Sequence, residues 1–180
     1  MKYEELLEND NVRAFLALIK FTEGAGYRTL FGGEQFSSFA DHPRRAITRN
    51  LGGQPITSTA AGAYQFLSRT WDECARACAL PDFSPRSQDI GALFLIERRR
   101  ALNAVLEGDW GTALARCSKE WASLPGSPYG QPVKSLETCL TFLKEQKAKE
   151  EATAPTPFPQ PKPKPEMPKW LHSLLRLFRR

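Results

Sequence analysis

The chain has 180 residues, of which 41% are hydrophobic and 25% charged, and its formal net charge is +5 at pH 7. This length supports one domain with a sizeable core rather than two large ones, and the composition is that of a globular protein. No segment approaches the roughly 18–20 apolar residues of a membrane-spanning helix, and the acidic N-terminus lacks the apolar core of a secretory signal. We therefore expect a chain without a signal peptide or transmembrane helix that folds in a cytoplasm.

The positive charge is concentrated at the C-terminal end of the chain. Residues 155–180 contain six lysines and arginines against one acidic residue, Glu166, so this segment carries +5 and the preceding residues balance at zero. Seven of the fourteen prolines also lie in residues 155–168. The basic character therefore belongs to a tail, which argues against a nucleic-acid-binding face on the globular part.

These shifts in composition divide the chain into three parts. We predict a compact domain over residues 1–148, a Pro- and Lys-rich linker over residues 149–168 and a short helix over residues 169–180. The linker alternates proline with other residues, a pattern typical of a stiff polyproline-like spacer that reaches on the order of 40 Å.

The first predicted helix covers residues 11–22. Its apolar residues recur at helical spacing, and Glu23 continues the same stripe four residues after Ile19. A carboxyl group at that place is partly desolvated, which raises its pKa toward the working range of a general acid. Gly24 and Gly26 end the helix and let a substrate approach closely. The alternative is an ordinary glutamate at a frayed helix end.

Two segments without helical spacing follow this helix. Residues 27–40 contain a glycine turn between aromatic flanks, which indicates a small β-hairpin around Gly32 and Gly33. We expect a loop from Asp41 to Pro55. Residues 58–66 combine small side chains with an amide and an aromatic ring, the groups that a sugar-binding cleft uses, although an ordinary loop entering a helix has the same composition.

The rest of the domain is predicted to be helical. Helices are expected over residues 66–79, 86–106, 109–121 and 133–147, and Leu136, Leu140 and Leu143 are expected to face the core. The aromatic, Pro- and Gly-rich stretch from Trp121 to Gln131 forms either a cleft rim or a packing corner. Strands are too few for a Rossmann sheet, so the predicted fold class is α+β and mainly helical.

The four cysteines do not indicate a metal site. Cys74 and Cys78 lie four residues apart and can face one another on a helix, but a zinc site needs two further ligands, and neither histidine stands at metal-binding spacing. In a reducing compartment we expect buried thiols. The prediction is therefore no metal and no cofactor.

Seven short segments of the domain together match the pattern of a known family. They are residues 13–16, 23–24, 32–36, 41–44, 58–65, 82–89 and 121–126. In this order and at this spacing they resemble the lambda-type endolysins, lytic transglycosylases with a lysozyme-like fold. The resemblance covers roughly residues 11–145. The family's catalytic glutamate stands in a Ser-Glu-Gly context, which Thr22-Glu23-Gly24 matches with threonine for serine. The stretch between Gly24 and Gly32 is shorter in this chain than in the family. This difference affects the expected shape of one lip of the cleft and not the catalytic position.

The resemblance implies a two-lobed domain that cleaves the β-1,4 bond between N-acetylmuramic acid and N-acetylglucosamine in peptidoglycan. Glu23 is then both acid and base, and the product is a 1,6-anhydro sugar. The residues expected to position the substrate are Ser58, Thr59, Gly62, Tyr64, Gln65 and Tyr129. A hydrolytic route needs a second carboxylate, for which Glu34 and Asp41 are the candidates, although Asp41 also suits a loop cap before His42.

The predicted C-terminal helix is cationic and amphipathic and lies outside the resemblance. Its apolar face comprises Trp170, Leu171, Leu174, Leu175 and Phe178, and its positive charge includes Arg176, Arg179 and Arg180. Twelve residues are too few to span a bilayer, but the pattern is typical of an interfacial helix that binds anionic lipid or lipopolysaccharide. The alternative is a helix that docks on a protein partner or on the enzyme itself.

Two classes of function remain open at this point. The first is a phage endolysin, either a lytic transglycosylase or a hydrolytic lysozyme, which acts as a monomer on glycan strands. Such a protein is expected to accumulate in the host cytoplasm before lysis and to act afterwards in the periplasm, at the cell wall. The second is a non-catalytic antibacterial protein whose tail permeabilises membranes.

Overall fold

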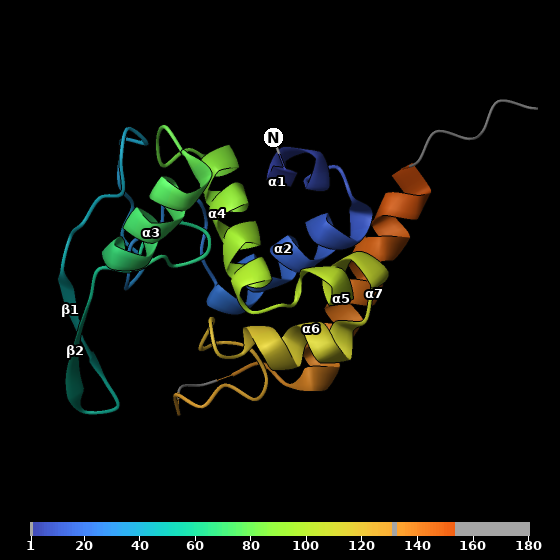
Figure 1. Ribbon diagram of the computed structural model, residues 1–180. Coiled ribbons are helices and arrows are strands. Elements are labelled where there is room, and N and C mark those ends of the chain that lie inside the picture. Colours follow the sequence, from blue (N-terminus) through green and yellow to red (C-terminus); the bar gives the residue numbers. More distant parts are fainter. Residues whose placement is uncertain (1, 131–132, 154–180) are drawn as a thin grey trace, which may run out of the picture.

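The computed structural model describes residues 2–130 and 133–153 (Figure 1). The elements in chain order are α1 (Lys2–Leu6), α2 (Asp10–Glu23), β1 (Ile47–Leu51), β2 (Gln54–Ser58), α3 (Ser68–Cys78), α4 (Pro85–Arg98), α5 (Leu102–Glu107), α6 (Trp110–Cys117) and α7 (Leu136–Thr153). Helices dominate, and the two strands pair as a small antiparallel sheet, so the predicted mainly helical α+β class is confirmed. No helix within these residues is long and apolar enough to cross a membrane.

The elements form two lobes with α4 between them (Figure 1). The β1–β2 hairpin and α3 lie on one side of α4, and α3 packs against it. The other lobe holds α2, α5, α6 and α7, and α2 packs on both α5 and α7. The hairpin projects from the first lobe, away from α7.

The helix α2 is the main apolar element of the second lobe. The Asn9 side chain accepts a hydrogen bond from the Val12 amide and so caps the N-terminus. Its buried positions include Val12, Phe15, Leu18 and Ile19, which are fully enclosed, and burial of each contributes about 1.5–3 kcal/mol. Gly24 ends the helix with φ 62°, a left-handed conformation that glycine adopts without strain. The helix predicted over residues 11–22 is confirmed.

The central helix α4 is shorter than predicted. Ser84 caps its N-terminus and Pro85 occupies the first turn, as expected for this pair of residues. The expected single helix over residues 86–106 is wrong, because the chain leaves the helix after Arg98. Arg100 takes a left-handed conformation with φ 59°, and α5 begins only at Leu102. No glycine or proline marks this break.

The sheet lies later in the chain than the expected hairpin. Residues 29–35 form a turn with one isolated bridge between Thr29 and Gln35, whereas the strands β1 and β2 occupy part of the region predicted as a loop. Gly52 and Gly53 join the strands, both with positive φ, as a tight two-residue hairpin requires. The β-branched residues of Ile47-Thr48 and Ile56-Thr57 are the signal that the loop prediction overlooked.

The last two helices also differ from their predicted bounds. The helix α6 ends at Cys117 instead of residue 121, and α7 starts at Leu136 and continues to Thr153. The predicted linker start at residue 149 therefore falls inside α7. The orientation of α7 was predicted correctly for Leu143, which is buried, and wrongly for Leu136, which is 50% exposed in the first turn.

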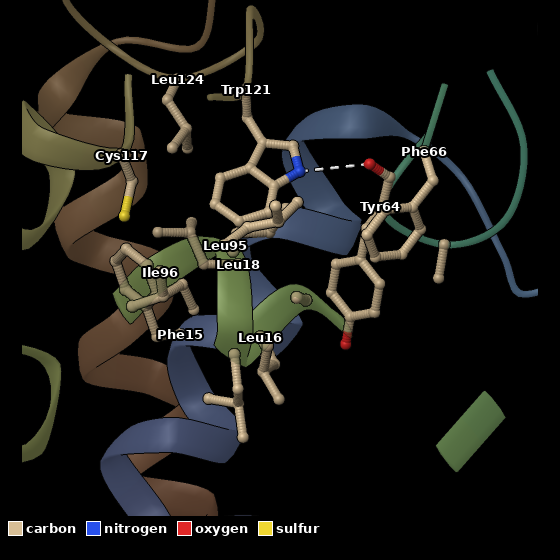
Figure 2. Packing of buried hydrophobic residues seen from close by; sticks show 14 of the residues in the cluster. Phe15, Leu16, Leu18, Tyr64, Phe66, Leu95, Ile96, Cys117, Trp121 and Leu124 are labelled. Atoms are coloured by element: carbon tan, nitrogen blue, oxygen red, sulfur yellow. Dashed lines mark hydrogen bonds between the residues drawn. The ribbon is translucent and has the colours of Figure 1, made fainter. Parts of the chain in front are cut away.

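The core joins both lobes through aromatic side chains. Figure 2 shows Trp121, which follows α6, with its indole Nε1 donating to the backbone oxygen of Tyr64 at 3.1 Å. Phe66 packs edge-on against Trp71 of α3, and Trp71 packs edge-on against Phe83 at 4.6 Å between centroids. The loop before α3 is therefore fixed against the segment after α6.

The cysteines belong to this packed interior. Cys74, Cys117 and Cys139 are buried, Cys78 is half-buried, and all four are free thiols. Burial raises the pKa of both Cys74 and Cys117 to about 12, so these two thiols stay protonated at neutral pH. The prediction of buried thiols therefore holds for Cys74, Cys117 and Cys139 and is wrong for the half-buried Cys78. No group of three or more candidate metal ligands occurs within residues 2–130 and 133–153.

Candidate functional site

A cleft of about 500 Å³ opens beside the C-terminal end of α2. Its wall includes Glu23 from α2, Ser58 at the end of β2, Gln65 before α3, Arg98 and Arg99 at the end of α4, and Lys119, Glu120, Trp121 and Tyr129 after α6. Both lobes therefore contribute to the wall. Its lining mixes aromatic and hydrogen-bonding groups, which is the composition that sugar-binding clefts use.

Glu23 occupies the place in this cleft that its sequence position predicts. It is the last residue of α2 and is half-buried, and Gly24 behind it leaves open space around its α-carbon. Burial raises the pKa of the Glu23 carboxyl, and hydrogen bonds from Ser123 oppose that rise only in part. A carboxyl group in this state holds its proton to higher pH than an exposed glutamate does.

Ser123 connects Glu23 to the interior of α2. Its Oγ lies 2.6 Å from Glu23 Oε1 and 3.0 Å from Thr22 Oγ1, and Thr22 Oγ1 donates to the Ile19 backbone oxygen at 3.0 Å. A hydroxyl has one hydrogen, so Ser123 donates to Glu23 or to Thr22 but not to both. When Glu23 is protonated, it can donate to Ser123, Ser123 to Thr22, and Thr22 to the Ile19 backbone oxygen, so each hydroxyl hydrogen has an acceptor. The arrangement accommodates the acid form of Glu23 fully.

Three of the six predicted substrate-positioning residues offer polar side chains at the cleft. Ser58 Oγ accepts from the Ala60 amide at 3.1 Å, and Tyr129 donates its hydroxyl to the Lys119 backbone oxygen at 3.0 Å while remaining 56% exposed. Gln65 has φ 48°, and its Nε2 donates to the backbone oxygens of Thr29 and Gly62. These bonds hold the Gln65 amide so that Oε1 is the atom available to a sugar.

The other three predicted positioning residues have mainly structural contacts. Thr59 Oγ1 accepts from the Ser68 amide at the start of α3, and Gly62 lies directly against the Gln88 side chain, where a β-carbon would come within 2.2 Å. Tyr64 borders the cleft, but its ring is buried and its hydroxyl donates to Asp89 at 2.5 Å. Their substrate contacts stay a prediction, and these geometries do not favour them.

Neither predicted second carboxylate lines the cleft. Glu34 forms ion pairs with Arg49 at 2.6 Å and with Arg45 at 3.6 Å, next to the β1–β2 hairpin. Asp41 accepts from the His42 amide at 2.7 Å and forms an ion pair with Arg44 at 3.1 Å. The loop-capping alternative for Asp41 therefore describes its observed contacts.

A different carboxylate, Glu120, lines the cleft together with Glu23. Its side chain is 9% exposed, and its two oxygens accept from Arg98 Nη2 at 2.6 Å and from Arg99 Nε at 2.7 Å. Arg98 also reaches Glu73 of α3 at 2.6 Å. Sequence reasoning missed Glu120, because a glutamate between Lys119 and Trp121 carries no periodic or motif signal.

The residues predicted to bind membranes lie outside the described residues. They are Trp170, Leu171, Leu174, Leu175, Arg176, Phe178, Arg179 and Arg180.

Comparisons with known proteins agree on one kind of relative. A family model described as Endolysin matches residues 13–149. The endolysin of Escherichia phage lambda is 41% identical over 147 residues, which cover 76% of this chain and 91% of the relative. The endolysin of Escherichia phage P2 is 39% identical over 151 residues, which cover 74% of this chain and 90% of the relative.

Solved structures lead to the same group of proteins. Bacteriophage lambda lysozyme in complex with a chitohexasaccharide superposes with a TM-score of 0.73 at 40% identity, over 77% of this chain and 95% of that one. A second structure of lambda lysozyme gives a TM-score of 0.64 at 37% identity, over 82% and 96%. The lysozyme-like fold predicted from the resemblance is confirmed.

Proposed function

Because the chain belongs to the endolysin family, we propose that it cleaves peptidoglycan as a lytic transglycosylase with Glu23 as its acid and base. The family membership makes the chain a phage endolysin, a glycosidase that lyses the cell wall by cleaving its glycan strands. The proposal adds the reaction type, the bond and the residues. The bond is the β-1,4 link between N-acetylmuramic acid and N-acetylglucosamine.

The observation that carries the proposal is the contrast between the two carboxylates of the cleft. Glu120 has both oxygens bonded to guanidinium groups, whereas Glu23 is bonded to the neutral Ser123 hydroxyl and has a raised pKa. Glu23 is therefore the carboxyl group suited to donate a proton to the glycosidic oxygen. A lytic route needs one such group, and a hydrolytic route uses a second.

The reaction then proceeds in two steps at one residue. Protonated Glu23 donates to the glycosidic oxygen, and the bond to the muramic acid C1 breaks with the development of an oxocarbenium-like centre. The C6 hydroxyl of the same sugar attacks C1 and gives its proton to Glu23. The products are a 1,6-anhydro-muramic end and a free hydroxyl on the leaving sugar, and Glu23 is protonated again.

The polar groups of the cleft support the binding of such a strand. Gln65 Oε1, Ser58 and the exposed Tyr129 ring offer an acceptor, a hydroxyl and an aromatic surface to the N-acetyl and hydroxyl groups of a sugar. The lambda lysozyme that this chain resembles was solved in complex with a chitohexasaccharide, which is an N-acetylglucosamine strand.

The experiment is mass spectrometry of the fragments released from purified peptidoglycan, with Glu23→Gln beside the parent. We expect muropeptides that end in anhydro-muramic acid, lighter by one water than hydrolysis products, and none from the variant. Reducing-end muramic acid from the parent would instead establish a hydrolytic lysozyme. No fragments from either protein would overturn cleavage altogether and leave the tail as the antibacterial part.

We also propose that the C-terminal segment brings the enzyme to an anionic membrane surface. The support is the sequence pattern alone, an apolar face with Trp170 and Phe178 and a cationic face with Arg176 and Arg179. Deletion of residues 155–180 is expected to abolish binding to vesicles that contain anionic lipid and to leave cleavage of purified peptidoglycan unchanged. If the truncated protein still binds these vesicles and lyses intact cells equally well, the segment has another role.

Release to the wall is part of the same proposal. The enzyme accumulates in the host cytoplasm and reaches the periplasm through a membrane opening made by a partner, or through the action of its own tail. It acts on the glycan strands as a monomer.

A further inference from the structure

One end of the cleft wall is cationic, although the globular part of the chain has no net charge. Arg98, Arg99 and Lys119 line the cleft that contains Glu23, and the two arginines pair with Glu120 in the same wall and with Glu73 of α3, which leaves one positive charge in excess. Residues 1–154 contain equal numbers of basic and acidic residues, so this excess is local. Binding of an uncharged glycan strand would not require this excess of positive charge.

Contacts within this end fix the positions of its positive charges. Arg98 is occupied by Glu73 and Glu120, and Arg99 uses Nε for Glu120 and Nη2 for the Lys119 backbone oxygen at 2.9 Å. The same backbone oxygen accepts from the Tyr129 hydroxyl. The Lys119 backbone is therefore held from two sides, on the same wall as the Arg99 guanidinium.

Lys119 is the cation at this end that is left for a ligand. Its side chain is exposed, and its Nζ has no hydrogen bond or ion pair within residues 2–130 and 133–153. Arg99 Nη1 likewise has no partner there, and the Arg99 side chain remains 34% exposed. An ammonium and a guanidinium on the same cleft wall can both donate hydrogen bonds to a carboxylate.

We propose that Lys119, supported by Arg99, binds a carboxylate of the peptide stem that muramic acid carries. This inference rests on the proposed function and names the part of the substrate that the cationic end recognises. The sugar rings of peptidoglycan are uncharged where the lactyl group is joined to the stem, and the stem supplies free carboxylates. The cleft then selects peptide-bearing strands over a plain N-acetylglucosamine polymer.

The test uses the full chain and two soluble substrates, peptidoglycan strands and the same strands with their stem carboxylates converted to neutral amides. We expect the parent to show a higher KM on the amidated strands. Lys119→Gln is expected to raise KM on the charged strands by about two- to fivefold with kcat unchanged, the range of an exposed ion pair, and to abolish the difference between the substrates. Lys119→Arg is expected to restore it.

Lys144→Gln on α7 is the matched control, because it removes an equal charge from an exposed position outside the cleft wall. The tail is the same in every variant, so its charge cancels in the comparison. The inference is overturned if Lys119→Gln changes KM equally on both substrates, if it changes neither, or if Lys144→Gln has the same effect. If the parent cleaves neither substrate, the proposed function itself fails.

Discussion

The same cleft contains two carboxylates, Glu23 and Glu120, whose surroundings are opposite in kind. At the end of α2, Glu23 is half-buried, its bonded partner is the neutral Ser123 hydroxyl, and its pKa is raised. At the end of α4, Arg98 and Arg99 enclose Glu120, whose side chain is nearly buried. Burial next to a neutral hydroxyl makes a carboxyl group a proton donor, whereas burial between guanidiniums makes it an ionic anchor. The partner, rather than the burial, decides the role.

Substitution of Glu23 is expected to separate the two carboxylates by activity. Glu23→Gln is expected to lower the rate of peptidoglycan cleavage by about 10³-fold or more. The glutamine amide can neither donate a proton to the glycosidic oxygen nor accept one from the C6 hydroxyl. The melting temperature should stay within a few degrees of the parent, since the amide keeps the Ser123 contact. Initial rates on purified sacculi together with thermal unfolding provide the check. A variant with a tenth of the parent activity would remove Glu23 from its role.

Glu120→Gln is expected to have the converse outcome. Loss of the charge leaves Arg98 and Arg99 close together without their shared partner, which is expected to lower the free energy of unfolding by about 1–3 kcal/mol. This range is below that of a fully buried pair because both arginines keep about a third of their side-chain exposure. Urea unfolding measures the loss. Cleavage abolished as completely as in Glu23→Gln, with stability intact, would make Glu120 a catalytic group.

Ser123→Ala tests how the neutral hydroxyl acts on Glu23. The hydrogen bonds from Ser123 lower the Glu23 pKa, so their partial loss is expected to raise it further and to move the alkaline limb of the pH–rate profile to higher pH. The rate at the optimum is expected to fall about tenfold, as for the loss of one hydrogen bond to a charged group. Ser123→Thr, which keeps the hydroxyl, is the control. An unchanged alkaline limb would mean that Ser123 does not act through Glu23.

His42 extends the comparison from carboxyl groups to a buried base, and a modest change in stability is expected there. His42 Nε2 lies 2.9 Å from the Phe66 oxygen, its Nδ1 accepts from the Arg44 amide at 3.0 Å, and burial lowers its pKa below 6.5. Its stabilising contribution is therefore complete above pH 6.5 and is lost as pH falls toward the folded pKa. Unfolding free energies between pH 7 and pH 5 are expected to decrease in the parent and to decrease less in His42→Gln. Equal slopes for the two proteins would contradict this.

Periodicity alone made Glu23 a candidate at a helix end, and the resemblance to the endolysins was needed to separate it from an ordinary glutamate at that place. Glu23 follows an apolar stripe and precedes a glycine, and both signals are local. Ser123 and Thr22 lie 101 positions apart, and their contact follows from the tertiary packing that places the segment after α6 on the end of α2. Glu120 is recognisable only through its two arginine partners, which α4 supplies from about twenty residues earlier. Such contacts carry no periodic signal.

The errors in the fold, by contrast, concern short segments of the chain. The Gly52-Gly53 turn between β-branched pairs is a hairpin signal, and the loop prediction gave it too little weight against the glycine pair at residues 32–33. The break between α4 and α5 falls at Arg100, which takes a left-handed conformation with φ 59° although arginine has good helix propensity.

The exit of α7 has a consequence for how this protein can change. Its last described turn, at residues 150–153, lies on the opposite side of the molecule from the β1–β2 hairpin (Figure 1). We expect segments joined after α7 to be exchangeable without disturbing the cleft around Glu23, because none of the described side chains of α7 lines that cleft. The same exit is the natural junction for fusion engineering, because an added domain would start away from the cleft around Glu23.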